Sequence, residues 1–143
     1  MTSPNQRQPR RAGPLARHPR GFTLIELMIT VAVLALLATV AFPTYQAAMV
    51  KNRRAAAKAY LSDVAQRQQQ YLMDARAFAE TPEELKAPPP AEVANYYAIA
   101  IEVSASLPPA FTATATPHAG GPQAADGPLR ITSTGERTPA DKW

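Results

Sequence analysis

The sequence predicts an α+β fold in which one long N-terminal helix packs against a small antiparallel β-sheet of about three to four strands. Three observations support this prediction. A long apolar run extends from Phe22 to Phe42, a helical spacing of apolar residues continues to about residue 74, and an alternating pattern appears between residues 97 and 133. The 143 residues are enough for one small domain besides the apolar run.

The apolar run contains a single charged residue, Glu26. As a helix it spans about 31 Å, close to the thickness of a bilayer's hydrocarbon core. A charge within such a helix costs about 2.5–3.5 kcal/mol on insertion scales, so Glu26 needs a partner. A signal peptide or a plain anchor leaves this charge unexplained. Thr39-Val40-Ala41 still resembles a signal-peptidase site, so a secreted domain beginning at Phe42 stays open as an alternative.

Residues 1–20 contain five arginines and no acidic residue, and their prolines are evenly spaced. We expect a disordered leader whose arginines favour retention on the cytoplasmic side of a membrane. From Phe22 onward, ten basic residues face eleven acidic ones. The basic character of the chain therefore belongs to the leader, and composition does not predict a strongly basic nucleic-acid-binding module.

After the apolar run, Pro43 removes one backbone hydrogen bond and is expected to kink the helix. The helix then becomes amphipathic. Its apolar stripe is predicted to face a core and consists of Tyr45, Met49, Ala56, Tyr60, Val64 and Tyr71. Further on, Thr81-Pro82-Glu83-Glu84 has the spacing of a capping box and predicts one or two additional helical turns.

Alternation with a period of two predicts strands at residues 97–103, 111–116 and 129–133. Their inward-facing residues would be Tyr97, Ile99, Ile101, Val103, Phe111, Ala113, Ala115, Leu129 and Ile131. The chain has no cysteine, so no disulfide can hold the segment 124–143. We therefore expect a mobile C-terminal tail.

The segment Gly21-Phe22-Thr23-Leu24-Ile25-Glu26-Leu27-Met28, followed later by Phe42-Pro43-Thr44-Tyr45-Gln46, resembles the start of a type IV prepilin. Residues 95–117 and the C-terminal Trp143 are similar to one branch of that family, the short minor pilins. The resemblance implies the pilin "lollipop", with a membrane-spanning helix half and an amphipathic half that carries the sheet. It also implies cleavage between Gly21 and Phe22, methylation of the new Phe22 amine, and an assembly function for Glu26.

The resemblance implies three regions: a cleaved leader (1–21), a transmembrane or filament-core helix half (22–43) and a globular domain (44–143). Before assembly the chain would cross the inner membrane once, with its C-terminal domain in the periplasm. After assembly it would lie in an extracellular pilus. Its implied partners are other pilin subunits, the prepilin peptidase, the inner-membrane pilus assembly machinery and, before assembly, the lipid bilayer.

We therefore expect a structural minor subunit of a type IV pilus, serving twitching motility, adhesion or DNA uptake. One alternative is a minor pilin that binds DNA as a receptor in natural transformation, with Arg130, Arg137 and Lys142 facing phosphates. The slight acidity of the chain after Phe22 argues against this alternative. Another is a pseudopilin of a type II secretion system, although the Pro43-Thr44-Tyr45-Gln46 junction favours a pilus.

Enzymatic activity is not expected. The only histidines are His18 and His118, cysteine is absent, and no glycine-rich phosphate loop or metal-ligand spacing is present. We therefore predict no catalytic residues, no metal ligands and no cofactor.

Overall fold

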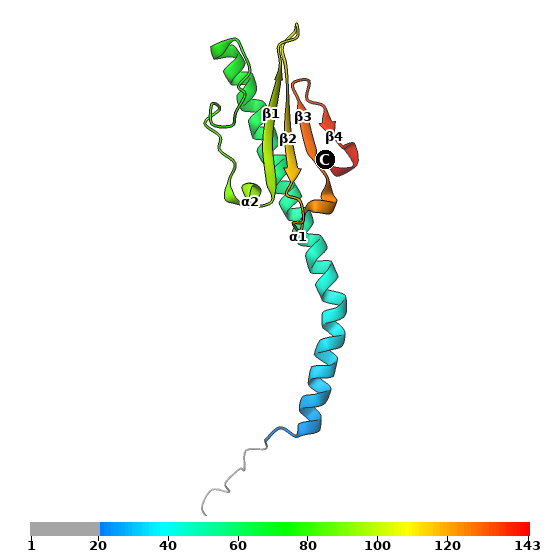
Figure 1. Cartoon of the computed structure of the whole chain (residues 1–143). Coiled ribbons are helices and arrows are strands. Elements are labelled where there is room, and N and C mark those ends of the chain that lie inside the picture. Colours follow the sequence, from blue (N-terminus) through cyan, green and yellow to red (C-terminus); the bar gives the residue numbers. More distant parts are fainter. Residues whose placement is uncertain (1–20) are drawn as a thin grey trace, which may run out of the picture. The chain divides into compact units, whose positions relative to one another are not determined.

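The computed structural model describes residues 21–143, so the expected leader lies outside the described residues except for Gly21. The elements follow in the order α1 (Leu24–Ala75), α2 (Ala91–Ala94), β1 (Tyr97–Ser104), β2 (Ala110–Pro117), β3 (Leu129–Thr132) and β4 (Arg137–Thr138) (Figure 1). Short 3-10 turns lie at Ala124–Asp126 and Ala140–Lys142. The predicted α+β class is confirmed. The chain divides into two compact units after Thr39.

The first part of α1 is apolar and exposed. Thr23 caps the helix, because its Oγ1 accepts a hydrogen bond from the Glu26 N–H at 3.2 Å. An 18-residue window of α1 has a mean hydropathy of 2.5, and none of it is buried within the molecule. By length and composition, the helix is able to cross a membrane. Helix α1 runs through Pro43 without ending there, so the expected kink stays a prediction.

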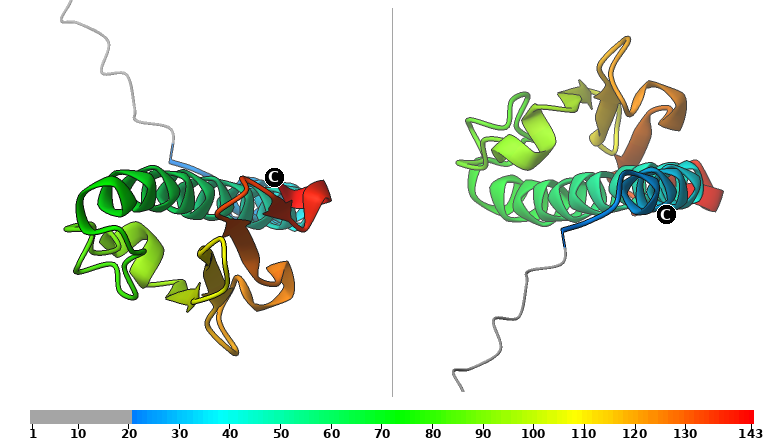
Figure 2. Two further views of the ribbon diagram at one scale, coloured as in Figure 1. Left: turned by 90° about the horizontal axis from the view of Figure 1, so that it is seen from above. Right: turned by 90° about the horizontal axis from the view of Figure 1, so that it is seen from below.

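The core lies between the later part of α1 and one face of the sheet. Ala57, Leu61 and Val64 are fully buried on the helix. The strands contribute Phe111, Ala113, Ala115, Leu129 and Ile131, all buried as the alternation predicted. The views from above and from below show β1, β2 and β3 on one side of this part of α1 (Figure 2).

The N-terminal end of the predicted stripe is not part of this core. Tyr45 is 64% exposed, and Met49 is only partly covered. Burial on α1 begins at Ala57, because the sheet covers the helix only from about that point. A helical pattern identifies a face but cannot show where along the helix a partner begins.

All neighbouring strands of the sheet are antiparallel, in the order β1-β2-β3-β4. The three predicted strands are confirmed, and the short β4 adds a fourth. Ile101 pairs with Ala113, Ala113 with Ile131, and Ile131 with Arg137. Directly paired residues project to the same face, so this row belongs to the helix-facing side of the sheet.

The prediction of one or two helical turns after Thr81 is wrong. Residues 82–86 form turns, although Thr81 Oγ1 does accept a hydrogen bond from the Glu84 N–H at 3.4 Å. Lys86 adopts a φ of 51°, and three prolines follow shortly afterwards, so a regular helix cannot continue. The short helix α2 begins instead at Ala91, after Pro90.

Gln68 joins α1 to the segment that follows it. The side chain is fully buried. Its Nε2 donates to the Ala79 carbonyl at 2.7 Å, and its Oε1 accepts from the Ala79 N–H at 2.9 Å. Gln68 therefore satisfies both backbone groups of Ala79 where no regular element pairs them.

We expect Gln68→Ala to lower the free energy of unfolding by about 2–4 kcal/mol, because it leaves two buried backbone groups without partners. Denaturant unfolding of the full chain in detergent, followed by near-UV circular dichroism, measures this loss. The exposed neighbour Gln69 supplies the matched control, Gln69→Ala. Equal stability of the two variants would show that the Gln68 contacts contribute little.

Candidate functional site

The candidate processing and assembly residues lie at the start of α1. Phe22 is 79% exposed, and Glu26 occupies the third position of the helix. Within residues 21–143, Glu26 makes no ion pair. The Thr23-x-x-Glu26 spacing is that of a capping box, a local explanation for Glu26 that the sequence analysis missed. The two explanations make different predictions for substitutions at Glu26.

The structure does not bring the three basic residues near the C-terminus onto one surface. Arg130 pairs with Thr114 and Thr138 and is exposed on the outer face of the sheet. Arg137 pairs with the buried Ile131, so it starts on the opposite face. Lys142 donates from Nζ to the backbone carbonyl of Asp126. An extended polyanion that contacted both Arg130 and Arg137 would therefore have to reach both faces of the sheet at β3 and β4.

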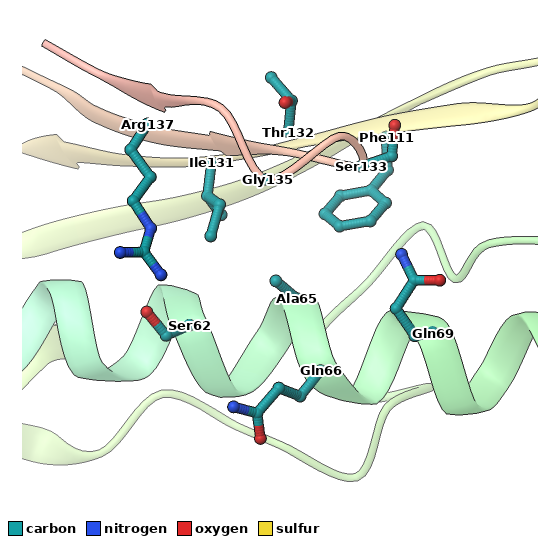
Figure 3. A pocket seen from close by; sticks show the side chains of 10 residues that line it. All are labelled: Ser62, Ala65, Gln66, Gln69, Phe111, Ile131, Thr132, Ser133, Gly135 and Arg137. Atoms are coloured by element: carbon teal, nitrogen blue, oxygen red, sulfur yellow. The ribbon is translucent and has the colours of Figure 1, made fainter. Parts of the chain in front are cut away.

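Arg137 points from β4 toward α1 at the mouth of a small pocket (Figure 3). Its guanidinium carbon lies 5.1 Å from the centroid of the Trp143 ring. The pocket has a volume of about 260 Å³ and is lined by Ser62, Ala65, Gln66, Gln69, Phe111, Ile131, Thr132, Ser133, Gly135 and Arg137. This arrangement fixes Arg137 by stacking on an aromatic ring and leaves its charge near polar side chains.

A buried ion pair connects α1 to the loop between β2 and β3. The Asp126 side chain is 1% exposed, and both of its oxygens accept hydrogen bonds from Arg54, one of them from Nε at 2.8 Å. Tyr97 Oη, on β1, donates to the same carboxylate at 3.2 Å. Gln123 Nε2 donates to Tyr97 Oη at 2.8 Å and to the Val50 carbonyl at 3.2 Å. One polar network therefore joins three parts of the unit.

The C-terminal tail is held by contacts of its own, against the expectation of a mobile tail. Trp143 Nε1 donates to the Thr138 carbonyl at 3.2 Å, and Lys142 reaches the backbone of Asp126. Asp126 thus binds α1 through its side chain and the tail through its carbonyl.

The network changes the acid–base properties of its members. Burial alone raises the pKa of Asp126, but the hydrogen bond and charge of Arg54 outweigh it and hold that pKa below its usual value. The hydrogen bond to Asp126 raises the pKa of Arg54. Burial raises the pKa of Tyr97, and it raises that of Tyr60 to about 12. Protonation of Asp126 therefore destabilises the fold only when the pH falls through and below about 3.9, the ordinary pKa of an aspartate.

His118 has a structural contact. Its Nε2 lies 3.0 Å from the Ala94 carbonyl, and the residue is exposed. In the part of the chain that the structure describes, no group of three or more His, Cys, Asp and Glu side chains is arranged to hold a metal ion.

We expect Arg54→Ala to lower the free energy of unfolding by about 3 kcal/mol near pH 7, because the buried Asp126 charge loses its partner. A depressed carboxyl pKa stabilises the fold above the ordinary value of about 3.9, so wild-type stability falls as the pH drops through and below that value. In the variant, protonation of the unpaired carboxyl relieves the buried charge. The stability deficit should therefore shrink from pH 7 toward pH 4.

Denaturant unfolding at several pH values measures this trend. Arg67→Ala is the control, because Arg67 forms an exposed i,i+4 pair with Asp63 and should lose less than about 1 kcal/mol. A deficit for Arg54→Ala that stays constant with pH would contradict the assignment.

Comparison with known proteins adds independent information. Residues 16–42 match the family model described as "Prokaryotic N-terminal methylation motif". A relative from Thermus thermophilus, described as "Type IV wide pilus major component PilA4", is 39% identical over 62 residues. That match spans 43% of this chain and 47% of the relative, less than half of either. Residues 43–128, more than half of the chain, match the model "Type IV minor pilin ComP, DNA uptake sequence receptor", and the chain therefore belongs to this type IV minor pilin family.

Proposed function

We propose that this chain is stored in the inner membrane and enters a type IV pilus through its N-terminal helix, after cleavage between Gly21 and Phe22. The observation that carries the proposal is the exposed apolar part of α1 with Glu26 as its single charge. Such a surface has to be shielded from water. Lipid would shield it while the subunit is stored in the membrane, and neighbouring helices would shield it in the pilus. Because lipid tails and packed helices are similarly apolar, this exchange costs little hydrophobic energy.

Glu26 would determine how neighbouring subunits align. Cleavage by the prepilin peptidase creates an α-amine with an ordinary pKa of about 7.7–8.0, so Phe22 gains a positive charge. In an apolar filament core, Glu26 of one subunit and the Phe22 amine of the next would neutralise each other. This proposal divides the chain into a leader (1–21), a filament-core helix half (22–43) and a globular domain (44–143). Its proposed partners are other pilin subunits, the prepilin peptidase and the inner-membrane pilus assembly machinery.

We expect Glu26→Ala and Glu26→Gln to insert into membranes normally but to reduce incorporation into pili severely, because both remove the charge. Quantitative immunoblotting of membrane and sheared-pilus fractions measures both steps. Glutamine can still complete a capping box, so assembly by Glu26→Gln would favour the local capping explanation. Thr23→Ala is the control. It removes the cap but keeps the charge, and assembly should persist.

The family description also supports a second function, binding of DNA at the surface of the globular domain. Arg130 and Arg137 lie on either side of the β3–β4 edge, and neither makes an ion pair within residues 21–143. Lys142 is already engaged with Asp126, so we propose the two arginines as the main phosphate contacts. Twitching motility and adhesion are further proposed processes for a pilus subunit. The pilin family match supports a pilus over a secretion pseudopilin.

We expect the full chain in detergent to bind duplex DNA with an affinity that falls as salt rises, because bound phosphates release counterions. Two phosphate contacts predict a slope of log K against log[salt] of about −2. Arg130→Gln and Arg137→Gln should each reduce the slope by about 1, whereas the paired Arg67→Gln should not. Fluorescence anisotropy at several salt concentrations measures the slope. Absent or salt-independent binding would contradict this second function.

A further inference from the structure

The small pocket next to Arg137 lies between α1 and the β3–β4 end of the sheet (Figure 3). We call it the Arg137 pocket. All of its lining residues belong to the compact unit after Thr39. Its volume of about 260 Å³ lies below the range of roughly 300–1,000 Å³ that is typical of sites for drug-sized ligands. The Arg137 pocket therefore accommodates a single ring-sized group.

The floor of the Arg137 pocket is apolar. Ala65 on α1 points toward the sheet, and Ile131 and Phe111 point from the strands toward α1 (Figure 3). Because the side chain of Ala65 is only a methyl group, it leaves space below these two strand residues. Phe78 packs edge-on against Phe111, with ring centroids 4.9 Å apart, and so holds that ring in place. A floor of this kind suits the flat face of an aromatic ring.

The two ends of the Arg137 pocket differ in their chemistry. At one end Arg137 points toward α1, where Ser62 faces it (Figure 3). At the other end Gln69 extends its amide from α1 toward the strands (Figure 3). Ser62 and Gln69 are seven positions apart in the sequence, which corresponds to about 10 Å along the helix. One end can therefore hold an anion, and the other can both donate and accept hydrogen bonds.

No acidic side chain neutralises Arg137. It makes no ion pair within residues 21–143, and none of the 10 residues that line the pocket is acidic. Stacking on Trp143 orients the guanidinium but leaves its N–H groups available to an acceptor. The guanidinium already lines the pocket in this position, so it can contact a ligand there without moving. A single fixed cation matches a ligand group with one negative charge, such as a phosphodiester.

We propose that the Arg137 pocket holds one unpaired nucleobase of a bound DNA strand. The inference rests on the proposed DNA-binding function and adds a site for a base to it. Arg137 bonds the phosphodiester next to that base, the base lies over the apolar floor, and the Gln69 amide bonds the edge of the base. A carboxylic acid with an apolar arm would match Arg137 and the floor but would not use the amide. A nucleotide matches all three parts of the pocket.

The test uses the full chain in detergent and two labelled single strands, a short oligothymidylate and an abasic strand with the same number of phosphates. Fluorescence anisotropy should show about tenfold tighter binding of the oligothymidylate, the effect of sequestering one base. Gln69→Ala should remove most of this preference without changing the salt slope, because the amide contacts no phosphate. Ala65→Leu fills the floor and should have the same effect. Gln70→Ala is the matched control and should behave as wild type, since Gln70 is also exposed on α1 but lies outside the pocket.

Equal binding of the two strands, or an unchanged preference in Gln69→Ala or Ala65→Leu, would overturn the base site. Displacement of the oligothymidylate by glucuronate would assign the pocket to an acidic sugar instead. Titration with a DNA duplex tests the underlying function separately. If the chain binds neither duplex nor single-stranded DNA, the DNA-binding function itself is overturned. If it binds both, but binds the abasic strand as tightly as the oligothymidylate, only the base site is overturned.

Discussion

The first part of α1 exposes an apolar surface that the chain itself does not cover. No residue in its most apolar 18-residue window is buried by the chain itself. A surface of this size is not stable in water, so the subunit needs lipid or other subunits around it. Glu26 is the single charge in the apolar run, and it makes no ion pair within residues 21–143.

The globular unit has a small hydrophobic core and no disulfide, so other interactions have to stabilise it. Buried polar groups supply the long-range connections. Gln68 on α1 binds the backbone of Ala79 in the segment that follows the helix. Asp126, in the β2–β3 loop, binds Arg54 on α1 and Lys142 in the tail. Each contact depends on hydrogen-bond geometry and, for Asp126, on protonation. The unit should therefore resist reduction but respond to acid, the reverse of a disulfide-clamped domain.

Periodicity was enough to predict the long helix and three strands, because each depends on local spacing of apolar residues. Features set by distant residues were not predictable in this way. Arg54 and Asp126 are 72 positions apart, and no local pattern connects them. The β3–β4 register places Arg130 and Arg137 on opposite faces, which their charges alone could not show. Tyr45 fits the apolar stripe but lies before the sheet begins to cover the helix.

Mass spectrometry of the mature amino terminus tests whether the apolar helix is kept as an assembly element. We expect a mature chain that begins with methylated Phe22 and so retains Glu26 and the whole of α1. A chain beginning at Phe42 would contradict it, because the apolar run would then be a removed signal peptide. Glu26 would have no function in the mature protein, and the globular unit would be a secreted domain.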